Sequence, residues 1–145
     1  MFRKLIATSA SWVPLPLRIA MGVVFMAHGA QKVLGSWGGP GFNAFISNDT
    51  PFAFMRPAWL WLAAAALSEL IGGLLVMIGL FTRVGAFFIG CVMLTAVVGV
   101  HANAFFGARG MEYALTLLLI AIALLISGGG ALSLDRVLSP RGRRR

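Results

Sequence analysis

An acidic residue, Glu69, lies in the middle of a largely apolar segment, Ala58–Phe81. About 20 such residues are enough to cross roughly 30 Å of membrane hydrocarbon. A carboxylate near the centre of a membrane span has no water unless the protein supplies it. Such residues usually face the interior of a helix bundle and mark a functional site. Glu69 is therefore the first candidate for chemistry, as a proton donor or acceptor in a buried polar site.

Further polar residues lie in or beside the other apolar segments: His28, Lys32, His101, Asn103 and Glu112. Lys32 follows His28 by four residues, so the two share one face of a helix. At about 1.5 Å per residue, His28 lies roughly 9 Å below the end of its helix, and Glu69 lies roughly 16 Å below the start of its own. We expect these side chains to converge in the outer half of a helix bundle, with Glu69 near His28 or Lys32.

Each of these residues also has an ordinary structural explanation. Glu69 could be a protonated carboxyl that is hydrogen-bonded within the bundle, and Lys32 could extend outward to water or lipid headgroups. His101 and Asn103 could be common helix-end residues, and Glu112 could complement the dipole at the start of its helix. The residue types and spacings leave these alternatives open, although their convergence on one side of the bundle favours a site.

The elements that would position these residues are four apolar helices. Pro57 precedes the second helix, and glycines follow the first and the fourth. Only Thr82 and Arg83 join the second and third helices, which requires an antiparallel hairpin. The residues from Ala131 to Leu134 could extend the short fourth helix. The predicted spans are residues 13–34, 58–81, 84–106 and 111–127.

Composition and charge place these helices in a membrane. The chain has 145 residues, of which 59% are hydrophobic and 11% charged, whereas charged residues make up about 25% of a typical soluble domain. We therefore predict an all-α fold, a single polytopic membrane domain over residues 1–145 with a four-transmembrane-helix bundle. No metal site is predicted, and the one cysteine, Cys91, excludes an internal disulfide.

The distribution of basic residues predicts the orientation of this bundle. Arg3, Lys4, Arg83 and the basic tail, residues 135–145, fall on one side of the predicted spans. Because Lys and Arg accumulate on the cytoplasmic side, both termini are predicted to be cytoplasmic, in the inner (plasma) membrane. The net charge of +8 does not indicate nucleic-acid binding, since no basic stripe is interleaved with polar surface.

Two helix faces are built for close packing. In the first span, spacings of three and four residues place Arg18, Gly22, Phe25, Gly29 and Lys32 on one side. In the second, small residues surround Glu69: Ala65, Ala66, Gly72, Gly73 and Val76. Small residues let membrane helices approach closely, so we expect these two faces to pack together.

The loop between the first two spans, residues 35–57, is rich in aromatic residues: Trp37, Phe42, Phe45, Phe52 and Phe54. Aromatic side chains prefer the membrane interface. The loop could be a partly embedded flap over the outer mouth of the bundle, or an interfacial anchor.

The order of these motifs resembles the DoxX family over nearly the whole chain. The first span carries Leu17-Arg18 and Gly29-Ala30-Gln31-Lys32, followed by Gly35 and Gly38-Gly39-Pro40-Gly41. The second carries Glu69, Gly72, Gly73 and Gly79-Leu80-Phe81-Thr82-Arg83. His101, Glu112-Tyr113 and Ser133-Leu134-Asp135 follow in the expected order. The resemblance implies a four-helix membrane protein from a family associated with thiosulfate:quinone oxidoreductase, with quinone or thiol redox stress, and with a membrane complex that includes superoxide dismutase.

The resemblance further implies a polar pocket that receives a quinone, lined by Arg18, His28, Lys32, Glu69, His101 and Glu112. Quinone reduction needs proton donors near two carbonyl oxygens, which His28, Glu69 and His101 could supply. Lys32 or Arg18 could stabilise a reduced, anionic ring. Phe25 could stack on the ring, and Asn103 and Glu112 complete the predicted binding residues.

The leading prediction is thus a subunit of a quinone-linked oxidoreductase, embedded in the lipid bilayer. It would borrow electrons from a partner redox protein, or act as a homo-oligomer. Haem is a weaker alternative, in which His28 and His101 are axial ligands. Two other classes stay open: a small-solute transporter working as an oligomer, with a path lined by Glu69 and Lys32, and a non-catalytic assembly or scaffold subunit.

Overall fold

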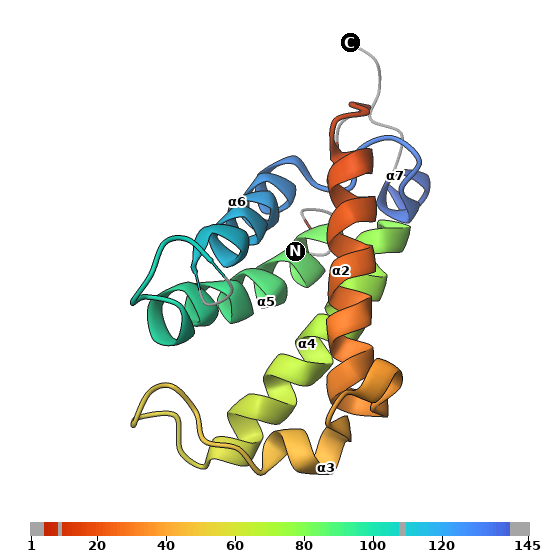
Figure 1. Ribbon diagram of the computed structural model, residues 1–145. Helices are drawn as coiled ribbons and strands as arrows, with labels where there is room; N and C mark the ends of the chain where they lie inside the picture. The colour runs from red at the N-terminus through yellow and green to blue at the C-terminus, as the bar shows by residue number, and fades with distance from the viewer. Residues whose placement is uncertain (1–4, 9, 108–109, 140–145) are drawn as a thin grey trace.

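The computed structural model describes residues 5–8, 10–107 and 110–139 (Figure 1). Within these ranges all regular structure is helical, as predicted. The long helices are α2 (Pro14–Leu34), α4 (Ala58–Ile78), α5 (Thr82–Thr95) and α6 (Glu112–Ser127). Shorter elements are η1 (Ser36–Gly38), α3 (Gly41–Ile46), the π-helical turn η2 (Ala96–Val100) and α7 (Leu134–Leu138).

Helices α2 and α4 pack closely because glycines remove side chains where they cross. A Cβ atom on Gly29 would overlap the backbone nitrogen of Leu70, and one on Gly22 would overlap Cβ of Met77. On the other helix, a Cβ on Gly73 would lie 2.8 Å from the backbone nitrogen of Met26. The predicted packing of the two small-residue faces is therefore confirmed at these glycines.

Gly72 packs against a different helix from Gly73. A Cβ atom at Gly72 would lie 3.2 Å from Cγ1 of Ile89, on α5. A Cβ on Gly85 of α5 would in turn lie 2.9 Å from the carbonyl oxygen of Gly72. Since Gly72 and Gly73 are adjacent, α4 packs closely on two neighbours at the same height, with α2 on one side and α5 on the other.

The turn between α4 and α5 occurs three residues earlier than predicted. Helix α4 ends at Ile78, because Gly79 takes a left-handed conformation with φ 71° and begins the turn. Phe81 is also left-handed, with φ 47°. The connection is thus residues 79–81, and Thr82 and Arg83 already belong to α5. Helices α4 and α5 form the predicted helical hairpin and contact each other, but they spread apart with distance from the turn (Figure 1).

The third and fourth helices also differ from their predicted lengths. Regular α-helix ends at Thr95, and the π-helical turn continues to Val100 instead of reaching residue 106. The fourth helix does not continue through Ala131–Leu134. Gly128, with φ 73° and ψ −163°, interrupts it, and α7 begins as a separate helix.

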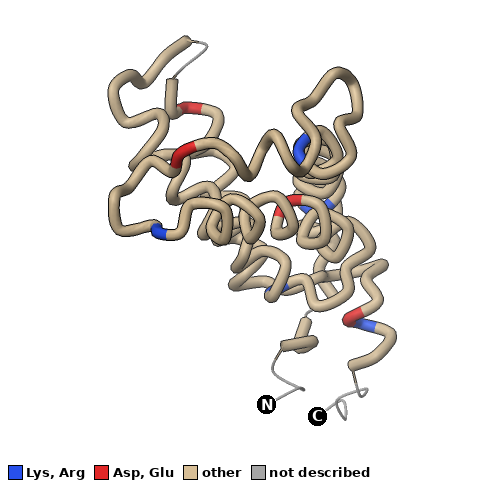
Figure 2. Tube along the Cα trace, turned by 90° about the horizontal axis from the view of Figure 1, so that it is seen from below, with Lys and Arg blue, Asp and Glu red and all other residues tan. Residues whose placement is uncertain are grey.

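The surface of this bundle is apolar to a degree unusual for a water-soluble protein. Large hydrophobic side chains such as Val23, Ile71 and Leu119 are exposed, and charged residues are sparse along the trace (Figure 2). Two segments, Ala58–Ile78 and Thr82–Val100, are long and apolar enough to cross a membrane by length and composition. Arg3, Lys4 and residues 141–145, which carry much of the predicted orientation, lie outside the described residues.

The helices are arranged so that the long loops lie at one end of the bundle, while the α4–α5 turn and α7 lie at the other. Helices α2 and α4 form one closely packed pair, and α5 and α6 form another, with α4 against α5 joining them. The two pairs diverge toward the end that holds residues 35–57 and 101–107, which we call the loop end (Figure 1). The opposite end, formed by residues 79–82 and 128–135, we call the clasp end. The buried core between them includes Met21, Phe25, Ile89, Leu117 and Leu124.

Candidate functional site

A cavity of about 410 Å³ lies between the two helix pairs toward the loop end. A volume in this range is typical of sites for small organic ligands. Its polar lining comes from α2, the loop, α4, the end of α5 and the residue after η2: His28, Lys32, Asp49, Glu69, Thr95 and His101. Aromatic rings of Phe25, Phe45 and Tyr113 line it as well. The cavity therefore combines a polar group of side chains with flat apolar walls.

An ion pair between Lys32 and Glu69 is the main electrostatic feature of the cavity. Lys32 Nζ donates to both carboxylate oxygens of Glu69, at 2.5 Å to Oε1 and 2.6 Å to Oε2. The Glu69 side chain is only 2% exposed, while that of Lys32 is 25% exposed. A charge removed from water is tolerated when an opposite charge and hydrogen bonds compensate it. The expectation that Glu69 lies near Lys32 is confirmed, and Lys32 points to Glu69 instead of extending outward.

The loop supplies an aromatic ring on the exposed side of this ion pair. Lys32 Nζ lies 5.1 Å from the centre of the Phe45 ring, within the range of a cation–π interaction. Gly35 makes this possible, because its left-handed conformation (φ 71°) ends α2 and turns the chain back. Helix α3 then lies against both α2 and α4, so Lys32 is held between a carboxylate and a ring.

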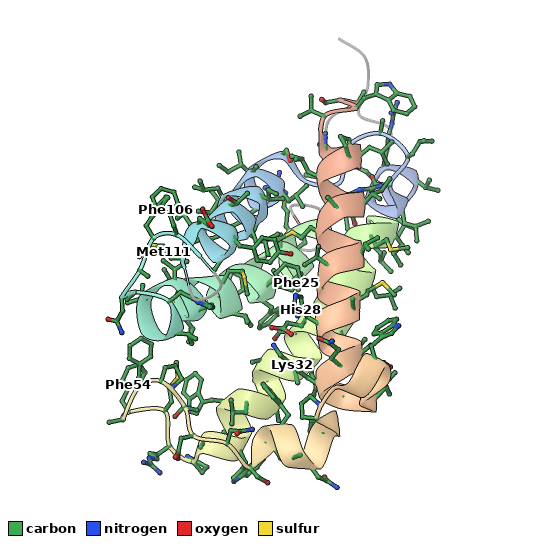
Figure 3. All side chains as sticks on the ribbon, in the orientation of Figure 1. Phe25, His28, Lys32, Phe54, Phe106 and Met111 are labelled. Carbon is green, nitrogen blue, oxygen red and sulfur yellow. The ribbon has the colours of Figure 1, made fainter. Side chains whose placement is uncertain are left out.

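The three cavity residues of α2 lie one turn apart. Phe25, His28 and Lys32 follow each other down the helix on the side that faces the space between the helix pairs (Figure 3). Phe25 is buried deepest, and His28 is exposed to the cavity. His101 approaches from the other helix pair, directly after the π-helical turn. Turns of this kind are rare in proteins, and those that occur are often found at functional sites. This one brings the chain to the cavity wall.

Part of the loop covers the cavity at the loop end. Phe45, Asp49 and Pro51 belong to its lining. A Cβ atom on Gly99 would lie 2.8 Å from Cζ of Phe52, so the ring lies directly against η2. The loop therefore bridges the two helix pairs. Phe54 extends from the tip of the loop (Figure 3).

Three predicted site residues do not line the cavity. Asn103 and Glu112 are exposed at the loop end, and Glu112 Oε1 accepts a hydrogen bond of 3.4 Å from the backbone N–H of Gly107. Arg18 lies at the clasp end, where its Nη2 donates to the carbonyl oxygen of Leu132 at 3.1 Å. Of the predicted site residues, the cavity thus brings together five: Phe25, His28, Lys32, Glu69 and His101. It adds Phe45, Asp49 and Tyr113, which were not predicted as site residues.

The clasp end holds a separate buried polar cluster. Asp135 accepts hydrogen bonds from the backbone N–H groups of Phe81 (2.7 Å) and Thr82 (2.9 Å). Its own N–H donates to the carbonyl oxygen of Gly79 at 2.8 Å. The carboxylate thereby satisfies the free amides at the start of α5. A Cβ atom at Gly79 would overlap Nη1 of Arg18. This cluster, which we call the clasp, joins α2, the α4–α5 turn and α7.

The described residues contain no group of three or more His, Cys, Asp or Glu side chains placed to hold a metal ion. Cys91 is exposed on α5. The side chains of Lys32, Glu69 and the two histidines are of types that can form hydrogen bonds, transfer protons and stabilise charge.

Comparison with known proteins agrees with this architecture. The sequence model of the DoxX family matches residues 13–102. The chain is 34% identical over 122 residues to a Bacillus subtilis (strain 168) protein named "Putative oxidoreductase CatD", with 83% of each chain covered. It is 33% identical over 141 residues to an uncharacterized membrane protein of Mycobacterium tuberculosis, covering 86% of this chain and 80% of the relative.

An uncharacterized protein of Haemophilus influenzae is 34% identical over 128 residues, covering 82% of this chain and 85% of the relative. No solved structure matches the chain. The matched residues 13–102 include the ion pair, both cavity histidines and the π-helical turn that leads to His101. The protein is accordingly a helical membrane protein that belongs to the DoxX family.

Proposed function

We propose that the cavity binds the ring of a quinone and that the protein is the membrane subunit of a quinone-linked oxidoreductase. The observation that carries this proposal is the buried Lys32–Glu69 ion pair on the wall of a cavity that also presents His28 and His101. Buried ionisable residues in a membrane protein usually mark a functional site. One relative of similar sequence bears the name "Putative oxidoreductase CatD", which supports the same class.

Three features of the cavity support the binding of a quinone ring. Its volume of about 410 Å³ is large enough for a substituted six-membered ring. Phe25, Phe45 and Tyr113 offer aromatic surfaces for stacking. The two ring carbonyls need hydrogen-bond donors on opposite sides, and the cavity has them: Lys32 and His28 on α2, and His101 across the cavity.

The proposed roles of the side chains follow from their positions. Reduction of a quinone to a quinol consumes two electrons and two protons. In this proposal, His28 and His101 donate hydrogen bonds and pass protons to the carbonyl oxygens. Lys32 supplies positive charge where negative charge develops, and Glu69 holds Lys32 in place through both of its oxygens.

The electrons must come from a partner redox protein, because the side chains of the cavity carry none. We place the cavity toward the outer face of the inner membrane, with both termini cytoplasmic, since the basic residues follow that bias. A partner would then bind either at the loop end or along the exposed apolar faces, and a homo-oligomer could use the same faces.

Quinone binding by the purified full chain tests this proposal. The protein in mild detergent is titrated with a fully substituted benzoquinone, and its lipid extract is analysed by mass spectrometry for co-purified quinone. The Lys32→Gln/Glu69→Gln double variant removes the ion pair without leaving one charge unpaired. Glu112→Gln is the matched control, since it makes the same change outside the cavity.

The proposal expects saturable binding in the parent protein and in Glu112→Gln, and at least about tenfold weaker binding in the double variant. Equal binding in all three would show that the ion pair does not form the site. If none of them binds a quinone and none co-purifies, the redox proposal fails. The scaffold or transport functions then become the better explanation of the buried pair.

A further inference from the structure

A second, apolar cavity of about 320 Å³ adjoins the polar cavity. It lies between α4 and α5 and is covered at the loop end by Thr50, Pro51 and Met55. We call it the lateral cleft. Four residues line both spaces: Pro51, Leu62, Val92 and Thr95.

The lateral cleft has the character of a site for a hydrocarbon chain. Its lining includes the small side chains of Ala64 and Ala65 and the exposed aromatic residues Trp61, Phe87 and Phe88. The hydroxyl of Thr95 donates to the carbonyl oxygen of Cys91 at 3.0 Å, and that of Thr50 donates to the carbonyl oxygen of Met55 at 3.1 Å. Of the three hydroxyls in the lining, those of Thr50 and Thr95 are hydrogen-bonded to backbone and that of Ser68 remains, so the cleft offers few groups for a polar ligand.

The cleft opens through a face that the membrane would cover. Both flanking segments, Ala58–Ile78 and Thr82–Val100, are the ones long and apolar enough to span a bilayer. The alternative route, at the loop end, is covered where Pro51 and Phe52 lie against Gly99. The polar cavity is thus covered toward the loops, and the apolar cleft beside it lies between the two segments that could span a bilayer.

We propose that one lipophilic molecule occupies both spaces, with its polar ring beside Lys32 and Glu69 and its hydrocarbon tail in the lateral cleft. The molecule enters sideways from the bilayer between α4 and α5, passing Leu62 and Val92. This inference rests on the proposed quinone function and adds the substrate class, a quinone with a long hydrocarbon tail. It also assigns the cleft between α4 and α5 as the tail site.

Cys91 provides the test, because it lines the lateral cleft, is exposed, and is the one cysteine of the sequence. The full chain in detergent is reacted with an apolar maleimide, and the rate of Cys91 modification is followed by mass spectrometry. Two fully substituted benzoquinones are compared, identical except for a methyl or a decyl group at one ring position. Full substitution prevents the rings from alkylating the thiol.

The inference expects both quinones to bind and only the decyl compound to slow Cys91 modification, by about tenfold at saturation. The Lys32→Gln/Glu69→Gln variant should lose this protection, because the ring that anchors the tail is no longer held. Protection that persists in this variant would reflect partition into detergent and would overturn the inference. If both quinones bind and neither protects Cys91, the tail site is wrong while the proposed function stands. If neither binds, both are wrong.

A second variant tests the cleft without chemical labelling. Ala65→Phe places a ring inside the cleft, and Ala20→Phe makes the same change on an exposed face of α2 outside both cavities. Ala65→Phe should weaken binding of the decyl quinone by about tenfold and leave that of the methyl compound unchanged. Ala20→Phe should change neither. Equal affinity of Ala65→Phe and the parent for the decyl compound would exclude the cleft as the tail site.

Discussion

Lys32 and Glu69 are bound to each other by two short hydrogen bonds but differ strongly in exposure, 25% against 2%. The lysine can reach water by rotating its long side chain, whereas the carboxylate cannot. The pair is therefore asymmetric: Glu69 depends on Lys32 for its charge compensation more than Lys32 depends on Glu69.

This asymmetry predicts the order of stability among variants of the pair. Lys32→Met leaves a buried carboxylate without its counter-ion and should destabilise the protein by about 3–5 kcal/mol. Glu69→Gln should cost only about 1 kcal/mol, the value of a lost hydrogen bond. The Lys32→Met/Glu69→Gln double variant should lose less stability than Lys32→Met does. Thermal unfolding of the full chain in detergent measures all three. Equal losses for the two single variants would contradict the asymmetry.

Gly29 should be intolerant of even one added methyl group. In Gly29→Ala the new Cβ would overlap the backbone of Leu70, so α2 and α4 must separate. Overpacking of this kind costs about 1–3 kcal/mol. Gly90→Ala is the matched control on α5, where the new Cβ would lie 3.6 Å from Cβ of Ala121.

The stability of Gly90→Ala should be unchanged or higher by up to about 1 kcal/mol, because alanine favours a helix more than glycine does. Thermal unfolding of the two variants side by side separates packing from propensity. A Gly29→Ala protein as stable as Gly90→Ala would show that the α2–α4 crossing is looser than the structure indicates.

Asp135 should contribute to stability although it lies far from the cavity in sequence and space. Asp135→Ala leaves the buried N–H groups at Phe81 and Thr82 without their acceptor, at about 1–3 kcal/mol for each unsatisfied group. Asp135→Asn keeps one oxygen and should cost less. Asp49→Ala, at an exposed position, should cost little. These costs are read from thermal unfolding, and a neutral Asp135→Ala would exclude the clasp as a stabilising contact.

The loop should detach from η2 when Gly99 gains a side chain. Gly99→Leu directs bulk into the rings of Pro51 and Phe52, so the backbone amides of residues 47–57 should exchange with deuterium faster, by about tenfold for a loss of roughly 1.4 kcal/mol. Phe52→Ala should act in the same direction. Val100→Leu, at the exposed neighbour, is the control and should leave exchange unchanged. Unaltered exchange in Gly99→Leu would mean that this contact does not hold the loop.

Sequence reasoning placed Glu69 near His28 or Lys32 because two simple rules suffice for that. Helical periodicity places Lys32 and Gly29 on one face, and the depth of Glu69 in its segment requires a buried partner. Small residues on both faces then bring the helices together. The loop residues Phe45 and Asp49 could not be placed in this way, since their positions depend on where the chain turns after Gly35 and on what it meets.

Arg18 shows the limit of the periodicity argument. It shares the face of Lys32, but it lies at the other end of the helix and meets Leu132, 114 residues away in sequence. A helical face identifies which residues point the same way and says nothing about which partner each one reaches. The ends of the third and fourth helices were likewise set by local backbone conformation, at η2 and at Gly128.

The clasp holds the helix pairs together at one end, so a change in the angle between them moves mainly the other end. Helix α4 has 21 residues, and at about 1.5 Å per residue it is roughly 30 Å long. With one end fastened by Asp135 and Arg18, a tilt of about 5° between the helix pairs would move the far end of α4 by roughly 2.6 Å, from that length. The same tilt would hardly disturb the fastened end. Under such a tilt, the width of the space between the helix pairs changes most at the loop end, and the contact of Phe52 with Gly99 opposes that change.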